Sequence, residues 1–196
     1  MWLIRAAELP PFIAVAIPNS PRRSWEYTPV PDGTREGGGA AAFGRFVIER
    51  VKPEIDREYR SLPDSAHTGI VGSSLGGIVS LYLGIEHPET FGMVGCVSPA
   101  AWWGGPELVR RTAARARPGL RVWIDIGTRE GGPAGWELTR RDAEAVYLAL
   151  LARDCRENVD ACFLVDEGAL HDERAWAARV PALLQFLLAS QPPASQ

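Results

Sequence analysis

The sequence predicts an α/β protein in which a mostly parallel sheet lies between two layers of helices. The first observation is a set of five short apolar runs that are continuous rather than alternating, as is typical of strands covered on both faces. The second is that stretches with helical periodicity fill the gaps between these runs. The third is the length of 196 residues, without an internal repeat or a linker, which favours a single domain over residues 1–196.

The apolar runs and helical patterns give the order of the elements. The expected strands are 12–18, 68–72, 91–98, 120–127 and 161–168, and the expected helices are 41–60, 75–86, 106–116, 136–153 and 173–190. Pro53 must kink or interrupt the first of these helices. The Gly- and Pro-rich stretch 29–41 is expected to form a loop, either mobile at the mouth of a site or a simple connector. We expect 1–10 and 190–196 to fray.

The composition excludes several classes of function. A net charge of −3 gives no electrostatic footprint for nucleic acid. No apolar stretch approaches the length that spans a membrane, and the N-terminus lacks the apolar core of a signal peptide. The three cysteines have no metal-ligand spacing, which favours reduced thiols. We therefore expect a cytoplasmic protein with no metal and no cofactor.

The segment Gly72-Ser73-Ser74-Leu75-Gly76 matches the pattern G-x-S-x-G. The pattern is weak by itself, but here it follows an apolar strand and opens an apolar helix. In this context the serine lies on a tight turn, the glycines let strand and helix pass closely, and the amides at the start of the helix point at a developing oxyanion. The interpretation is that Ser74 is a nucleophile and that the Leu75 N–H is an oxyanion donor. A purely structural corner is the alternative.

A serine nucleophile needs a base, and the chain contains three histidines. His67 precedes the strand, and His87 follows the helix after Ser74. Only His171 lies just past a strand, and in an open α/β sheet the site lies at the carboxyl ends of the strands. We therefore expect His171 to be the base.

The acid is expected between the serine and the histidine, past the end of a strand. Asp125 lies inside the expected strand 120–127, whereas Glu130 follows it in the loop. Position favours Glu130, and Asp125 stays open as the alternative.

Four segments together carry a family resemblance. These are "PFIAVAIPNSPRRSWEYTP", "GSSLGGIVSLYLGIEHPETFGMVGCVSPAAWW", "WIDIGTREGG" and "EGALHDERAW". They resemble the esterase family of α/β hydrolases that includes enterochelin esterases, esterase D and feruloyl esterase-like proteins. The resemblance runs from about Pro11 to Leu188, and it implies a three-layer α/β-hydrolase-type fold without a cap domain.

The resemblance also implies a catalytic triad and a substrate wall. The triad is Ser74, Glu130 and His171, and the segment "SPAAWW" is implied to line the substrate cleft with Ser98, Trp102 and Trp103. The expected activity is hydrolysis of short-acyl or aryl esters, with acyl transfer, or a catalytically impaired binding or scaffold protein, as alternatives.

The chain departs from the family at its N-terminus. Family members have more strands before the segment at 12–18 and a loop there that supplies the second oxyanion donor, so we expect an N-terminally shortened sheet. The exposed edge of such a sheet near 12–18 could be covered by a second copy, which predicts a homodimer.

Overall fold

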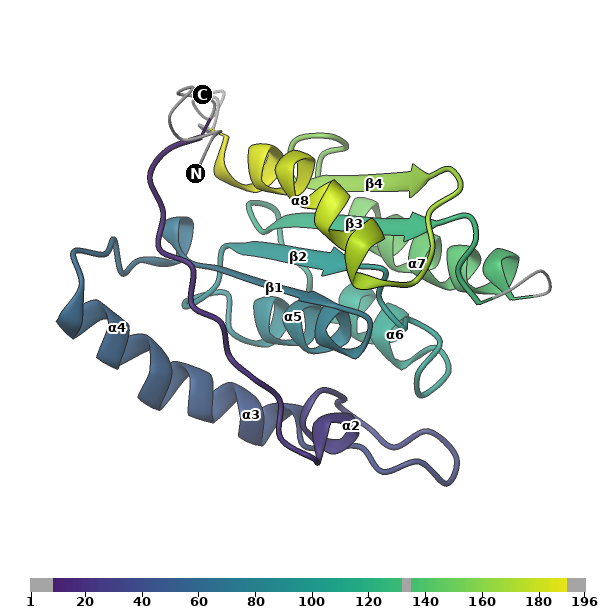
Figure 1. Ribbon diagram of the computed structural model, residues 1–196, viewed down its shortest axis with the longest axis horizontal. Helices are drawn as coiled ribbons and strands as arrows, with labels where there is room; N and C mark the ends of the chain where they lie inside the picture. The colour runs from purple at the N-terminus through teal and green to yellow at the C-terminus, as the bar shows by residue number, and fades with distance from the viewer. Residues whose placement is uncertain (1–8, 132–134, 190–196) are drawn as a thin grey trace.

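The structure is a computed structural model that describes residues 9–131 and 135–189. Its sheet has four strands in the order β1-β2-β3-β4, and every neighbouring pair is parallel (Figure 1). The strands are β1 (Gly69–Ser73), β2 (Met93–Val97), β3 (Arg121–Gly127) and β4 (Ala161–Asp166). Because all four strands point the same way, their carboxyl ends meet at one edge of the sheet.

The helices form the two outer layers. They are α2 (Arg23–Glu26), α3 (Ala40–Phe46), the π-helical turn η1 (Val47–Val51), α4 (Lys52–Glu58), the 3₁₀ turn η2 (Ser65–His67), α5 (Leu75–Glu86), α6 (Glu107–Arg115), α7 (Trp136–Leu151) and α8 (Glu173–Leu188). Helices α5, α6 and α7 cover one face of the sheet and α8 crosses the other, so the predicted three-layer architecture is confirmed (Figure 1). No helix in the described part of the chain combines the length and apolar character needed to cross a bilayer.

The side chains of the central strands alternate between two cores. In β2, Val94 and Cys96 face the core beneath α5–α7, whereas Met93 packs under α8. Strand β3 follows the same rule, and its Trp123 lies in the α8 core. Since successive side chains of a strand point to opposite faces, Asp125 also faces α8. This placement decides which partners Asp125 can reach.

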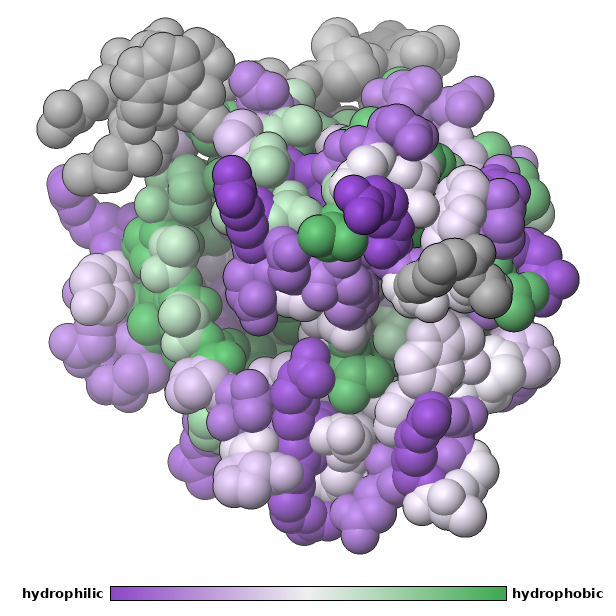
Figure 2. All heavy atoms as spheres, turned by 45° about the vertical axis from the view of Figure 1, so that its right-hand side comes forward, coloured by the Kyte–Doolittle hydropathy of each residue, from purple (hydrophilic) through white to green (hydrophobic). Residues whose placement is uncertain are grey.

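The expected strand at 12–18 is wrong. The segment belongs to no strand of the described sheet, where β1 pairs only with β2, and Phe12, Ile13 and Val15 are exposed. An apolar run indicates that burial of its side chains is favourable. Burial also needs a surface to pack against, which the composition of the run cannot show. Apolar side chains gather along the left of Figure 2, on the side where this segment runs in Figure 1. The homodimer expected through this edge stays a prediction, which a monomer in light scattering would contradict.

The helix expected at 41–60 forms as one continuous helical segment. The Lys52 N–H donates to the Val47 carbonyl oxygen five residues earlier, which makes η1 a wide turn between α3 and α4. Pro53 follows directly and has no N–H to donate. The wide turn therefore accommodates the proline, and the chain continues as α4 to Glu58.

Two further expectations concern irregular segments. The termini expected to fray lie outside the described residues, apart from positions 9 and 10. The loop 29–39 is tied to the loop that follows β2, because Trp103 Nε1 donates to the Val30 carbonyl oxygen at 2.8 Å and the Gly104 N–H donates to Asp32 Oδ1 at 3.2 Å. These hydrogen bonds join the two loops, and the alternatives of a mobile loop at the mouth of a site and a simple connector stay predictions.

Candidate active site

Ser74 forms the turn between β1 and α5. Its backbone has φ 56° and ψ −120°, in a region that side-chain-bearing residues rarely adopt. The Ser74 N–H donates to the Val97 oxygen at 2.9 Å, and its carbonyl oxygen accepts from the N–H of Gly77 at 3.0 Å and of Ala100 at 3.3 Å. The turn is therefore strained and held from three sides, as expected for a turn that presents a nucleophile.

The glycines around Ser74 have different roles. A Cβ atom on Gly72 would come within 2.4 Å of the Gly76 carbonyl oxygen, so strand and helix can pass here only with glycine. A Cβ on Gly77 would meet the Cβ of Pro99 at 3.1 Å, which is tight. A Cβ on Gly76 would meet no atom within 4 Å. The close passage predicted from the motif is thus confirmed at Gly72 but does not require Gly76.

The loops after β3 and β4 are hydrogen-bonded to each other. The Gly168 N–H donates to Thr128 Oγ1 at 2.8 Å, and the Arg129 N–H donates to the Ala169 oxygen at 3.0 Å. A Cβ on Gly127 would come within 2.4 Å of that same Ala169 oxygen, so a glycine at the end of β3 permits this contact. The two loops together carry the candidate acid and the candidate base.

Glu130 and His171 meet across these loops. Glu130 Oε2 lies 2.8 Å from His171 Nδ1, while Glu130 Oε1 accepts from the Gly127 N–H at 2.7 Å and from the Ser98 hydroxyl at 2.5 Å. The Glu130 side chain is 1% exposed and that of His171 is 38% exposed. Burial raises the pKa of Glu130, but the hydrogen bonds from His171, Ser98 and Gly127 more than offset it, so the pKa lies below its usual range. The carboxylate is therefore ionised and buried, and the imidazole reaches the surface.

Asp125, the alternative acid, has other partners. Its Oδ1 accepts from the Ser98 N–H at 3.0 Å and from Arg179 Nη1 at 2.6 Å, and its Oδ2 accepts from Trp123 Nε1 at 2.7 Å. Burial raises the pKa of Asp125. Of the two acids left open by the sequence, the structure brings Glu130 to His171 and places Asp125 under α8.

The other two histidines lie elsewhere. His67 pairs with Asp64 beside the amino end of β1, and His87 lies beyond the carboxyl end of α5, where it contacts Glu89. Ser74 and His171 both follow strand ends, although within the described residues their side chains are not hydrogen-bonded to each other. Such contacts commonly tighten only when a substrate is bound.

Ser98, expected to line the cleft, lies in the interior instead. It is fully buried, and its hydroxyl accepts from Trp176 Nε1 and from Arg179 Nη2, each at 3.1 Å, besides donating to Glu130. The sequence reasoning missed Arg179. Its signal was a single arginine inside the otherwise apolar stretch "AWAARVPALL" of the last helix.

The two tryptophans expected at the substrate wall differ in exposure. Trp103 is 6% exposed and hydrogen-bonded to Val30, so it anchors the loop 29–39. Trp102 is 39% exposed, and its ring centroid lies 5.8 Å from that of Trp103. The Arg35 guanidinium lies over both rings, at 5.2 Å from the Trp102 centroid and 5.9 Å from the Trp103 centroid. Of these two tryptophans, Trp102 therefore presents the larger aromatic surface to solvent.

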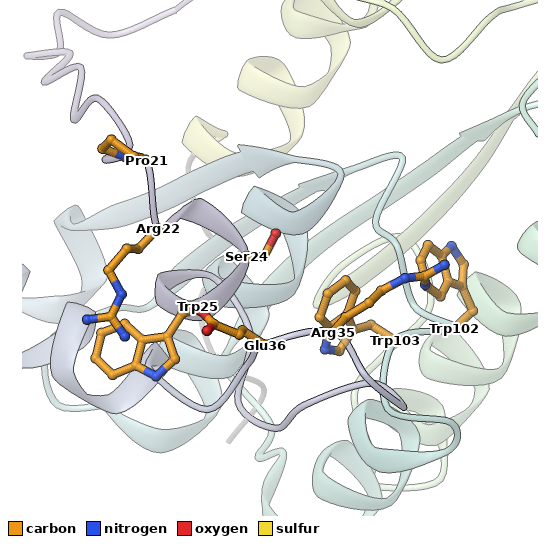
Figure 3. Close-up of a pocket in the computed structure, with 8 residues that line it drawn as sticks. All are labelled: Pro21, Arg22, Ser24, Trp25, Arg35, Glu36, Trp102 and Trp103. Carbon is orange, nitrogen blue, oxygen red and sulfur yellow. The ribbon is translucent and has the colours of Figure 1, made fainter.

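These side chains form part of an open pocket of about 530 Å³ (Figure 3). Its lining comes from α2 and the two residues before it, from the loop 29–39 and from the loop after β2: Pro21, Arg22, Ser24, Trp25, Arg35, Glu36, Trp102 and Trp103. A second cation stacks here, because the Arg22 guanidinium lies 4.2 Å from the Trp25 ring centroid. The Ala100 N–H contact with the Ser74 carbonyl oxygen links the loop that carries Trp102 to the Ser74 turn. The pocket thus combines aromatic faces with two arginines.

The Leu75 N–H is the first amide of α5 and directly follows Ser74. The first amides of a helix have no acceptor within the helix, so its role as an oxyanion donor stays a prediction. Within residues 9–131 and 135–189, no group of three or more His, Cys, Asp or Glu side chains is arranged to hold a metal ion.

The protein has one parallel sheet between two layers of helices, and a strained serine, a buried carboxylate and a histidine follow its strand ends. This is the architecture of the α/β-hydrolase-type esterases. The chain belongs to the esterase family described as "Putative esterase", whose pattern matches residues 1–187. The family membership expected from the sequence is therefore confirmed.

Several relatives are esterases of iron-binding siderophores. The chain is 29% identical over 158 residues to the iron(III) enterobactin esterase of Dickeya dadantii, covering 73% of this chain and 36% of that protein. It is 24% identical over 190 residues to the uncharacterized protein YbbA of Bacillus subtilis, covering 91% of this chain and 74% of YbbA. The crystal structure of the enterobactin esterase from Shigella flexneri superposes with a TM-score of 0.76 at 24% identity, over 95% of this chain and 46% of that one. The chain thus spans less than half of the Shigella enzyme.

Proposed function

We propose that the protein hydrolyses carboxylic esters through an acyl-enzyme formed on Ser74, with His171 as the base and Glu130 as the partner of the histidine. One observation carries the proposal. The buried Glu130 carboxylate lies 2.8 Å from His171 Nδ1, at the sheet edge where the strained Ser74 turn also ends. Membership of an esterase family supports the same chemistry.

In this mechanism the Ser74 hydroxyl attacks the ester carbonyl carbon and its proton passes to His171 Nε2. The imidazolium then donates this proton to the departing alcohol, and the acyl group stays on Ser74. A water molecule, deprotonated by His171, attacks the acyl carbon, and the acid leaves as Ser74 recovers its proton. Glu130 accepts the Nδ1–H throughout, which holds Nε2 free as the base and stabilises the imidazolium.

The developing oxyanion requires donors beside Ser74. The Leu75 N–H at the start of α5 supplies one of them in this proposal, assisted by the positive end of the helix dipole. Removing one such donor from a hydrolase costs roughly 100- to 1000-fold in rate.

The lining of the pocket does not include Ser74, Glu130 or His171, and we propose that the pocket receives the part of the ester that extends from the reacting carbonyl. Trp102 offers an apolar face for an aryl or short acyl group, and Arg35 offers a cation beside it. We therefore propose aryl esters with an anionic group as preferred substrates. Replacing Arg35 by Gln should raise KM for acetylsalicylate about fivefold and leave KM for neutral phenyl acetate within about twofold. Equal changes for both esters would contradict a role for the cation.

The central experiment compares matched variants on p-nitrophenyl butyrate and with a fluorophosphonate probe. Ser74→Ala should abolish labelling and lower kcat/KM by at least about 1000-fold, whereas Ser73→Ala, at the adjacent hydroxyl, should label normally. His171→Ala should behave like Ser74→Ala, and His87→Ala should retain activity. Absence of labelling in the wild type would favour a binding or scaffold protein. Product analysis in the presence of an added alcohol separates hydrolysis from acyl transfer.

A further inference from the structure

A cation lies buried beneath the candidate acid. Arg179 comes from α8 and is 3% exposed, and its Nη1 lies 2.6 Å from Asp125 Oδ1. Its Nη2 donates to Ser98 Oγ at 3.1 Å and lies 3.5 Å from Glu130 Oε1. Asp166, at the end of β4, lies 3.5 Å from Arg179 Nε and is one-third exposed. One guanidinium is thus shared by two fully buried carboxylates and a hydroxyl.

The hydrogen-bond directions in this cluster follow from the chemistry of its members. An arginine and an indole N–H can only donate, so the Ser98 oxygen must accept from both Arg179 and Trp176. A hydroxyl has two lone pairs and one hydrogen, and the hydrogen is left for Glu130 Oε1 at 2.5 Å. Glu130 Oε1 also accepts the Gly127 N–H, so that oxygen carries no proton of its own.

The His171 imidazole continues this chain of hydrogen bonds. With Glu130 ionised, its Oε2 accepts a hydrogen from His171 Nδ1. A neutral imidazole carries one hydrogen, so Nε2 is then the nitrogen with a free lone pair. A base at His171 needs this tautomer. Hydrogen bonds through Glu130 and Ser98 connect the imidazole to Trp176 and Arg179 of α8, which can only donate.

We propose that Arg179 is a positioning residue for ester hydrolysis: through Ser98 it orients the Glu130 carboxylate, and its charge keeps Glu130 and Asp125 ionised together. This inference rests on the proposed function, because it assigns Arg179 to the same acid and base. With both buried carboxylates ionised, Asp125, Glu130 and Arg179 together carry one negative charge, and the part-exposed Asp166 adds a second beside the guanidinium.

The other titratable groups around this cluster do not replace the arginine. Cys96 of β2 and Cys162 of β4 lie near Asp125, and burial raises the pKa of both thiols, so they stay neutral. Asp172 caps α8 by accepting the Ala175 N–H at 2.9 Å. Arg129 and Glu173 are exposed, so solvent and salt screen the effect of their charges on the cluster. Arg179 is thus the buried cation among the described residues that contacts Glu130.

The test removes the buried charges one after the other, which we call the charge cycle, and follows the His171 imidazole by NMR titration. The measurement does not depend on catalytic activity. Asp125→Asn removes a buried carboxylate, and Arg179 then neutralises Glu130 alone, so the midpoint of the His171 NMR titration should move to lower pH. Adding Arg179→Gln to that variant restores the original net charge, and the His171 pKa should return most of the way. The matched control Arg174→Gln, on the exposed side of the same helix, should leave it unchanged.

Kinetics give the second readout. Arg179→Gln should lower kcat by at least about tenfold with KM within about threefold, and Arg179→Lys, which keeps the charge, should recover most of that loss. The acid limb of the kcat/KM profile should shift with the His171 pKa in the charge cycle.

Different results would overturn the inference or the proposed function. If the His171 pKa stays constant through the cycle, or if Arg179→Lys and Arg179→Gln lose kcat equally, Arg179 is a structural residue only. If the wild type hydrolyses no ester, the proposed function fails, while the titration still decides whether Arg179 controls the charge at His171.

Discussion

The indole of Trp176 and the imidazole of His171 meet edge to face, with ring centroids 4.9 Å apart and planes inclined at 88°. The indole N–H of Trp176 donates to the buried Ser98 hydroxyl at 3.1 Å. One side chain on the first turn of α8 therefore contacts the candidate base and the group that donates to the candidate acid. The loop that carries His171 leads directly into that helix.

Replacement of Trp176 by Phe should separate these two contacts. Phenylalanine keeps an aromatic ring near His171 but loses the hydrogen bond to Ser98, which contributes about 1 kcal/mol. We expect kcat/KM on p-nitrophenyl butyrate to fall about fivefold, and Trp176→Leu, which also loses the ring contact, to fall further. Equal activity of the two variants would contradict a role for the ring.

Replacement of Gly72 and Gly76 by Ala should have opposite effects on stability. The added Cβ at Gly72 overlaps the Gly76 carbonyl oxygen, and backbone cannot move aside as a side chain can, so Gly72→Ala should destabilise the fold by about 3 kcal/mol. At Gly76 the added Cβ meets no atom within 4 Å, and alanine favours the helix by about 0.5–1 kcal/mol. Thermal unfolding of both variants checks this, and similar decreases in Tm would show the prediction to be wrong.

Replacement of Trp103 by Phe should loosen the loop 29–39. The variant keeps a buried ring but loses the 2.8 Å hydrogen bond to the Val30 carbonyl oxygen. Loss of about 1 kcal/mol of local stabilisation should raise the rate of tryptic cleavage after Arg35 about fivefold. Cleavage after Arg57 on α4 provides a control within the same digest and should keep its rate. An unchanged Arg35 rate would mean that other contacts hold the loop.

Replacement of Asp160 by Asn should destabilise the protein at neutral pH but not in acid. The buried Asp160 carboxylate accepts from Arg156 N, Nε and Nη2 at 2.9, 2.8 and 3.0 Å. The Arg156 hydrogen bonds lower the pKa of Asp160 and outweigh the opposing effect of burial. Because the folded-state pKa lies below the unfolded value near 3.9, this contribution is present above about pH 4 and disappears as the pH falls through the folded-state pKa.

Urea unfolding at several pH values tests this sign. At pH 7 the Asp160→Asn variant should be less stable than the wild type by about 1–3 kcal/mol, and the difference should shrink as the pH falls through the folded-state pKa of Asp160. Glu137→Gln, at an exposed position of α7, should show little difference at any pH. A difference in unfolding free energy between Asp160→Asn and the wild type that stays constant with pH would contradict this explanation.

Strands that are covered on both faces could be predicted, because burial favours a continuous apolar run. Strands β2 and β3 are examples, since every one of their residues is buried. The segment 12–18 has the same composition without a partner strand in the described sheet, and composition alone cannot distinguish the two cases. The π-helical turn before Pro53 was equally hidden, because the sequence marks the missing N–H but not how the helix adjusts to it.

The candidate site could be predicted in part. The positions of Ser74, Glu130 and His171 after strand ends brought them to one edge, because parallel strands share their carboxyl ends. The hydrogen bond between Glu130 and His171 depends on how two loops pack, and the burial of Ser98 depends on α8 covering it. Arg179 belongs to a helix far along the chain, and its contacts exist only once the layers assemble.

The hydrogen bonds between the loops after β3 and β4 limit how the site can change. Because Thr128 binds Gly168 and Arg129 binds Ala169, an insertion in either loop would displace the acid and the histidine together. Diversity among related sequences or engineered variants should therefore accumulate across the pocket, in the loop 29–39 and the loop after β2. Grafting new sequence into these two loops offers a test of ester selectivity that leaves the candidate acid and the candidate base where they are.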